Sequence, residues 1–311
     1  MSIIDTLSEG FRTVTRRLWI IIVPVALDVF LWLGPKLSVA PVIRDALATL
    51  QDAMRMMTPG GVVDTSLSES FQLMADELQA TIGQTNLFAL LAWGRLGMPS
   101  IAALRPIDPA VDRIIEVTGG VQMFGLQIAL LFAGLLVASL FLSLLGQEVR
   151  GEGVRLGVLV QSVPRYWLRL TTILAPLGIA LVVAFTTALM LGPLAFIVAA
   201  LLAWLLLYVS FVPQAITMAD ERPLRALWLS FAIVRYNFWP TVGLILLTNV
   251  IGSGLSLVWR GVMGTPSGVL LAILGNAYIG SGLTAAAFIF FRDRVAMWRD
   301  KQQLGSVNTH G

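Results

Sequence analysis

Three polar side chains lie inside stretches that are otherwise apolar, where their chemistry would operate within a membrane. Asp28 is the one acid well inside such a stretch, and Asn249 and Asn276 occur in two others. A carboxylate in apolar surroundings can carry a proton or an ion, or it can be a structural acid held by hydrogen-bond donors. We favour the structural alternative, because Asp28 precedes Pro35 by seven residues. It therefore lies within roughly 10 Å of one membrane boundary, where water or Arg260 could reach it.

Small and polar residues recur at helical spacing around both asparagines. One stripe is Asn249, Gly252, Ser253 and Ser256, and the other is Ala272, Asn276, Gly280 and Thr284. Small side chains let helix backbones approach, and Asn amides can hydrogen-bond between helices. We interpret the stripes as a packing seam; the alternative is a Gly-broken helix that lines a transport path.

The scarcity of reactive side chains argues against an enzyme. The chain has no cysteine, and His310 is its one histidine. Thiolate nucleophiles and thiolate zinc sites are therefore excluded, and a histidine relay inside the membrane has no histidine to use. Gly151-Glu152-Gly153 is too short and too charged for a phosphate-binding loop. We predict no catalytic residue, no cofactor and no metal site, so an ATP-driven process would need a separate subunit.

Composition identifies the class of protein. Of 311 residues, 57% are hydrophobic and 13% are charged, and the mean hydropathy is +0.83. Soluble domains carry about 25% charged residues, and disordered chains need low hydrophobicity. The sequence therefore predicts an all-α integral membrane protein. Its basic residues lie at membrane edges, so we expect no nucleic-acid partner.

Six stretches are long and apolar enough to cross a bilayer, which needs roughly 20 residues per helix. We name them spans one to six: Leu18 to Leu33, Val121 to Leu145, Thr171 to Met190, Pro193 to Val212, Trp239 to Val258 and Val269 to Phe291. Only Gly192-Pro193 separates spans three and four, which predicts a tight hairpin.

The placement of Lys and Arg predicts the orientation. Fourteen of the 21 basic residues lie in the N-terminal segment, in the segments after spans two and four, and after span six. Short basic segments stay on the cytoplasmic side. We expect a multi-pass protein of the bacterial inner membrane with both termini in the cytoplasm.

An internal repeat is the third architectural prediction. An amphipathic segment precedes spans one, three and five, and residues match at an offset of 70 between the second and third copies and of 220 between the first and third. In the third copy the apolar stripe is Leu224, Leu227, Trp228, Phe231, Val234 and Phe238. We read three units, each an interfacial helix plus a two-span hairpin; the alternative is that any short helix before a span is amphipathic. Such helices would lie among anionic headgroups, with these arginines as candidate contacts: Arg12, Arg16, Arg17, Arg155, Arg165, Arg225 and Arg235.

Residues 36–120 form a long loop between spans one and two, predicted as a helical extracytoplasmic insertion. Periodicity predicts helices over Pro41 to Met57 and Ser66 to Thr81, with a turn at Thr58 to Thr65. The apolar segment Asn86 to Leu104 is expected to lie on the membrane or dock against the helical bundle. We favour an insertion without a ligand over a partner-binding site.

These predictions describe a single membrane domain over residues 1–311. Its parts are the first interfacial helix and span one (1–35), the loop (36–120), span two with the second interfacial helix and spans three and four (121–217), the third interfacial helix with spans five and six (218–300), and a polar tail (301–311).

One stretch resembles a known group of proteins. Phe211-Val212-Pro213 through Asp220 is followed by Ala226-Leu227, Ser230, Val234-Arg235 and Asn237-Phe238-Trp239. This pattern resembles bacterial multi-span proteins of the glycerophosphoryl diester phosphodiesterase membrane-domain type and related uncharacterised families. The resemblance covers about thirty residues well and implies a six-helix membrane domain with no chemistry of its own. The phosphodiesterase domain is absent here, so no substrate is inferred.

The function predicted from these features is a non-enzymatic scaffold or transport-related membrane protein. The alternative is the permease subunit of an ABC-type exporter that works with a separate ATPase, and a third possibility is a structural subunit of a larger membrane assembly. The expected partners are the lipid bilayer with anionic headgroups and a further membrane protein or an ATPase.

Overall fold

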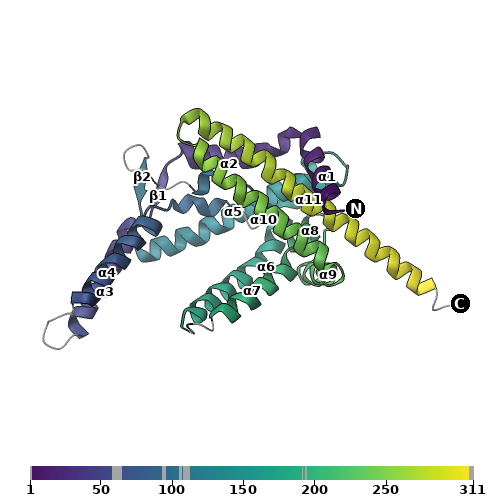
Figure 1. Cartoon of the computed structure of the whole chain (residues 1–311). Helices are drawn as coiled ribbons and strands as arrows, with labels where there is room; N and C mark the ends of the chain where they lie inside the picture. The colour runs from purple at the N-terminus through teal and green to yellow at the C-terminus, as the bar shows by residue number, and fades with distance from the viewer. Residues whose placement is uncertain are drawn as a thin grey trace. The chain divides into compact units, whose positions relative to one another are not determined.

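The computed structural model describes residues 2–57, 65–92, 96–104, 107, 113–190, 192 and 195–307. The chain forms two compact units (Figure 1). The first unit is Met1–Val25, Trp93–Pro99 and Leu135–Gly311, and the second is Ala26–Ala92 and Ser100–Gly134.

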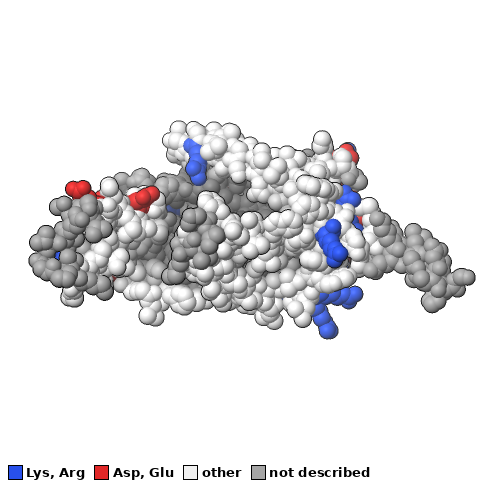
Figure 2. Space-filling view, turned by 60° about the horizontal axis from the view of Figure 1, so that its bottom comes forward, with Lys and Arg blue, Asp and Glu red and all other residues white. Residues whose placement is uncertain are grey.

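Five helices are long and apolar enough to cross a membrane, which confirms the all-α multi-pass class. They are α5 (Gly120–Val149), α6 (Leu156–Met190), α7 (Ala195–Val209, continued by α8, Val212–Thr217), α10 (Phe238–Val262) and α11 (Pro266–Val307). They correspond to spans two to six. Figure 2 shows a face on which charged side chains are few and uncharged residues make up most of the described surface.

Span one is shorter than the others. It consists of a 3₁₀ turn, η1 (Leu18–Ile21), and α2 (Ile22–Leu33). Together they extend roughly 26 Å, slightly less than the hydrocarbon thickness of about 30 Å. Lys36 follows α2, and its Nζ donates to the carbonyls of Leu31 and Trp32. A cation at a helix C-terminus satisfies carbonyls that have no partner within the helix.

Helices form over two of the segments that were predicted to be interfacial, and the two helices are alike. They are α1 (Ile3–Arg16) and α9 (Pro223–Tyr236), each of 14 residues. Each helix ends at a residue with extended φ and positive ψ: Arg17 at −138° and 62°, and Asn237 at −129° and 41°. Ser2 and Asp5 form the reciprocal cap that their spacing predicts.

The second interfacial segment differs from the prediction, because no break separates it from span three. α6 continues from Leu156 to Met190 through Pro164 and Pro176. At the position that matches Arg17 and Asn237, Trp167 is helical. The hairpin to α7 contains Gly192, whose φ of +56° is the left-handed conformation that glycine adopts readily. The predicted tail is also partly helical, since α11 reaches Val307.

Small residues bring α1 into backbone contact with α11. A Cβ on Gly10 would lie 2.6 Å from the Gly282 carbonyl oxygen and 2.7 Å from the Ala286 nitrogen. The matching position in α9 is Ser230, which is fully buried and whose Oγ donates to the Tyr208 carbonyl and accepts from the Phe211 N–H. Both helices therefore pack through small residues at the same place along their length.

Half of the predicted apolar stripe of α9 is exposed, although Val234 of the same stripe is fully buried. Leu224, Trp228 and Phe231 are 82%, 55% and 43% exposed, whereas Ala226 and Ser230 are buried. In a membrane the large apolar side chains can face lipid, and the small ones allow close packing.

The second unit contains the predicted loop helices. They are α3 (Ala40–Met57) and α4 (Thr65–Leu78), and α4 ends in a π-helical turn, Gln79–Gly83. The predicted turn at 58–65 lies almost entirely outside the described residues.

The second unit also contains two strands that the sequence analysis missed. They are β1 (Lys36–Ser38) and β2 (Ile114–Glu116), which pair in parallel with Leu37 opposite Ile115. Asn86 Oδ1 accepts the Leu37 N–H at 3.0 Å and so ties a third segment to them. Leu37, Val39, Leu87 and Val117 form the apolar core beside these strands.

Candidate functional site

Asp28 is held by the loop between spans one and two. It lies in α2 and is fully buried. Its carboxylate accepts from the Ser100 hydroxyl, from the Ile101 N–H at 3.1 Å and from the Ala102 N–H at 3.2 Å. The loop thus supplies the donors that we had assigned to water or Arg260.

The segment from Leu96 to Leu104, which we call the anchored segment, needs such an acceptor. Its backbone is irregular before the 3₁₀ turn Ala102–Leu104. Leu96, Met98, Ile101 and Ala102 are all less than 9% exposed. Buried N–H groups without helical partners must bond elsewhere, and carboxylate oxygens are strong acceptors. Asp28 therefore accepts hydrogen bonds from backbone N–H groups that have no helical partner.

The other half of the anchored segment packs on the middle of α11. The Gly97 carbonyl accepts from Thr284 Oγ1 at 2.5 Å, and Gly97 has a φ of +83°. A Cβ on Gly280 would lie only 2.2 Å from Pro99 Cβ. The predicted stripe on span six is therefore a contact surface, but its partner here is the loop rather than span five.

The stripes on spans five and six do not form the polar seam that we expected. Asn249 is exposed on α10, and its Nδ2 donates to the Ile245 carbonyl of its own helix at 2.8 Å. Asn276 is half-buried on α11. Among the described residues, no hydrogen bond joins the two amides. The contact between α10 and α11 includes Trp259, whose ring packs directly on Gly275. A Cβ added to Gly275 would lie only 2.5 Å from the nearest ring carbon.

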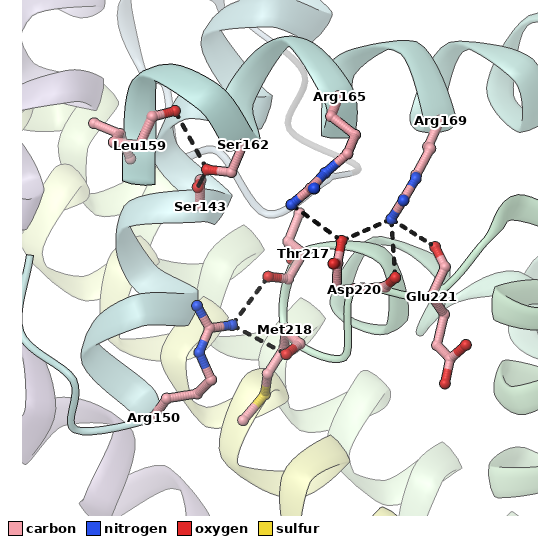
Figure 3. A network of polar contacts seen from close by, with 10 residues as sticks. All are labelled: Ser143, Arg150, Leu159, Ser162, Arg165, Arg169, Thr217, Met218, Asp220 and Glu221. Carbon is pink, nitrogen blue, oxygen red and sulfur yellow. Dashed lines mark hydrogen bonds and ion pairs between the residues drawn. The ribbon is translucent and has the colours of Figure 1, made fainter. Parts of the chain in front are cut away.

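Arginines gather where the predicted cytoplasmic segments meet, in a set of contacts that we call the arginine junction (Figure 3). Arg165 and Arg169, one turn apart on α6, both reach the Asp220 carboxylate, at 3.4 and 2.7 Å. Arg169 also donates to the carbonyls of Asp220 and Glu221. Asp220 has a φ of +54°, which is unusual for a residue other than glycine, so these arginines hold a strained turn.

Two further arginines of the junction bind the ends of helices. Arg150 Nη1 donates to the carbonyls of Thr217 and Met218 at 3.2 and 3.0 Å, at the end of α8 (Figure 3). Arg292 Nη1 donates to the Val149 carbonyl at 3.1 Å, at the end of α5. Arginine suits these positions because a planar cation satisfies the free carbonyls of a helix C-terminus.

The first interfacial helix joins the junction through Arg17, whose Nε lies 3.7 Å from Glu148 Oε2. Ser143 and Ser162 form a buried hydroxyl pair at 3.2 Å, which connects α5 and α6 (Figure 3). The segments before α2, after α5, after α8 and near the end of span six therefore meet in one place.

All seven predicted headgroup arginines remain available at the surface. Arg12, Arg17, Arg165 and Arg225 have side chains that are 65%, 58%, 50% and 76% exposed. Arg16, Arg155 and Arg235 are exposed as well. Arg12, Arg17, Arg165 and Arg225 each pair with an acid, and each guanidinium has five N–H donors, more than one such contact uses.

One acid outside the apolar helices has a shifted pKa. Hydrogen bonds from Ser2, first from its side chain and then from its backbone, hold the pKa of Asp5 below its ordinary value. This shift belongs to a helix cap. Within the described ranges, no group of three or more His, Cys, Asp or Glu side chains could hold a metal ion.

No protein-family model matches this chain, and no curated protein or solved structure shows significant similarity to it. The resemblance to phosphodiesterase membrane domains therefore stays a prediction.

Sequence reasoning missed several residues that organise the site. Ser100 and Gly97 lie in the loop and bond to residues 72 and 187 positions away, so no local pattern pairs them. Asp220 precedes α9 by three residues, a place from which an acid can cap a helix, but it does not do so. Instead Arg222 occupies the cap position without a side-chain bond, and Asp220 binds the arginines of α6.

Proposed function

We propose that this protein is a non-enzymatic, transport-related protein of the bacterial inner membrane. In this proposal it crosses the bilayer six times, and the anchored segment is re-entrant: it enters from the extracytoplasmic side and reaches the middle of span six. The observation that carries the proposal is the packing of Gly97 and Pro99 on Thr284 and Gly280 in the middle of α11.

The physics of lipid supports this interpretation. Irregular backbone at membrane depth is tolerated only where protein buries it or where it lines a water-filled cavity. Such segments are typical of channels and transporters, whose broken helices and re-entrant loops form ion and substrate paths. A protein that serves only as a scaffold would not need non-helical backbone at the depth of the middle of span six. It would also not need Asp28 as an acceptor for the N–H groups of that backbone.

The arginine junction supports six crossings. Arg17 before span one contacts Glu148 at the end of α5, so both lie on one side of the membrane. α5 has 30 residues, enough to span the bilayer fully, and its first residue, Gly120, then lies on the opposite side. The chain between Arg17 and Gly120 must therefore cross as well, and η1 with α2 is its apolar helical stretch.

The likeness of α1 and α9 supports the internal repeat. Their bounds differ by 220 at both ends, the same offset that the residue matches gave. Thr6, Gly10 and Val14 are the buried residues of α1, and Ala226, Ser230 and Val234 at the matching positions are buried too. In the second copy, the predicted interfacial segment and span three form one continuous helix, α6.

The exposed residues of α9 favour a lipid surface over an ATPase. Leu224 and Trp228 face outward beside Arg225, and this combination suits the headgroup layer, where rings and arginines both bind. The coupling helix of an ABC permease would present this surface to a soluble subunit. Copurification of a stoichiometric ATPase in mild detergent would favour the permease alternative.

Thiol labelling can test the transport proposal, because the chain has no cysteine of its own. Single variants Met98→Cys and Ala103→Cys are placed in inner-membrane vesicles and treated with small charged methanethiosulfonate reagents on either side. A segment that borders a path becomes labelled from the aqueous phase. Thr49→Cys on exposed α3 is the positive control, and Phe288→Cys, in the fully buried core of α11, is the negative one. Complete protection of both test positions from either side would favour a scaffold.

A further inference from the structure

Asn249 lies at the middle of a membrane helix with its side chain facing away from the protein. It is 11 residues from the start of α10 and 13 from its end, which places it roughly 16–20 Å from either end. Its Nδ2 donates to Ile245 of the same helix, and no described residue donates to its Oδ1. A polar amide at this depth therefore has an acceptor and a second N–H without a protein partner.

Hydrocarbon does not solvate such a group. Polar side chains in spans almost always face other helices or a water-filled cavity, because lipid offers no hydrogen bonds. The exposed amide of Asn249 therefore indicates that another protein surface, rather than lipid, covers this face of α10.

The surroundings of Asn249 have the shape of a helix contact. Leu246, Val250 and Leu257 are 65%, 61% and 68% exposed, and Ser253 lies between them. Positions 246, 250, 253 and 257 follow the alternating spacing of three and four residues by which paired helices interlock. Gly254 lies beside Val250 and Leu257 on the helix, and a Cβ built on it would meet no atom within 4 Å, so this side of the helix is open.

We propose that a second copy of this chain covers this face, with Asn249 of each copy bonded to Asn249 of the other. An amide is both donor and acceptor, so two of them related by a two-fold axis satisfy each other. An axis along the membrane normal brings residues of equal depth together, and this places the two Asn249 side chains opposite one another at mid-membrane. Arg260 lies near the end of the helix, where water and salt screen the repulsion between copies.

The inference needs only that α10 spans the membrane, and it is independent of the transport proposal. Disulfide cross-linking in native membranes tests it directly. Ser253→Cys is one turn from Asn249 on the same face, and Val183→Cys is a matched exposed position, 58% accessible on α6. Oxidation is expected to convert Ser253→Cys into a covalent dimer and to leave Val183→Cys monomeric.

A second measurement tests Asn249 itself. Fluorescence transfer between labelled copies in liposomes gives the dissociation constant. Asn249→Leu is expected to weaken dimerisation about 3-fold to 30-fold, from the range of polar contacts between membrane helices. Thr248→Val is the control, because Thr248 donates only to carbonyls of its own helix and should leave the constant unchanged.

Three results would overturn the proposal. One is equal cross-linking at Ser253→Cys and Val183→Cys, and another is a purified chain that stays monomeric in liposomes. The third is a dissociation constant that Asn249→Leu leaves unaltered. A Ser253→Cys adduct formed in cells with a different protein, but not between purified copies, would also contradict it and assign the face to that partner.

Discussion

Replacing Asp28 with alanine should release the anchored segment and lower the stability of the protein. The substitution leaves the N–H groups of Ile101 and Ala102 buried without an acceptor. Each unsatisfied buried donor costs about 1–3 kcal/mol. The Ser100 hydroxyl also loses its acceptor but can rotate to find another. Polar contacts between membrane helices average about 0.6 kcal/mol each, which sets a lower limit near 2 kcal/mol for the three bonds. We therefore expect a loss of about 2–6 kcal/mol in the free energy of unfolding.

A series of variants makes this prediction specific. Asp28→Asn keeps one acceptor oxygen but turns an amide donor toward the loop, so it should cost about half as much as Asp28→Ala. Ser100→Ala removes one bond and should cost about 1 kcal/mol. Asp45→Asn changes an exposed acid of α3, and we expect it to stay within about 0.5 kcal/mol of the parent.

Reversible denaturant unfolding in mixed micelles measures these differences, and thiol labelling at Met98→Cys reports on the segment itself. The anchor role predicts that labelling rises in the order parent, Asp28→Asn, Asp28→Ala. Stability of Asp28→Ala within about 0.5 kcal/mol of the parent, together with unchanged labelling, would refute the reasoning. Loss of a transport activity in Asp28→Asn at unchanged stability would instead support a proton or ion relay.

Three further predictions concern the first unit. Gly10→Ala places a Cβ 2.6 Å from the Gly282 carbonyl and should cost about 1–3 kcal/mol. Gly178→Ala, with nothing within 4 Å, should be neutral or stabilising by up to about 1 kcal/mol; thermal unfolding in detergent compares the pair, and equal losses would contradict the backbone contact. The pKa of Asp5 is lower in the folded protein than in the unfolded chain. The ionised carboxylate should therefore stabilise α1 fully when the pH is above the ordinary carboxyl pKa. This stabilisation should disappear as the pH falls through the pKa of Asp5 in the folded protein. Amide exchange at the start of α1 measures this, and a pH profile shared with Asp5→Asn would exclude it. Arg169→Ala removes the contacts with Asp220 and Glu221 and should lower the free energy of unfolding by about 1–2 kcal/mol. It should also speed proteolysis at the turn between α8 and α9. Arg12→Ala, at an exposed position, should change neither the stability nor the rate of proteolysis.

Periodicity predicted most of the helices, because the spacing of apolar residues is a local property. α3 and α4 begin and end within a few residues of the expected positions. Periodicity did not predict which side of α9 faces the protein. Lipid and protein interior are both apolar, so the size of the side chain decides: Ser230 and Ala226 pack inward, and Leu224 and Trp228 remain exposed.

The site was less accessible to sequence reasoning. Asp28 was singled out correctly as a buried acid, since an intramembrane carboxylate is costly without a partner. Its partners could not be named, because Ser100 lies 72 positions away in a loop without periodic pattern. The strands β1 and β2 have three residues each, too few for alternation to show. Asn249 was recognised for its residue type, but its orientation depends on how α10 and α11 rotate against each other.

The backbone contact of α1 with α11 has a consequence for how the protein is made. α1 leaves the ribosome long before α11, yet the surface that receives Gly10 is formed by Gly282 and Ala286. Until those residues are synthesised, α1 lacks this partner, and in the proposed orientation its exposed Arg12, Arg16 and Arg17 would contact lipid headgroups instead. The contact between α1 and α11 therefore forms late in synthesis, and until then the chain carries α1 without its main packing partner.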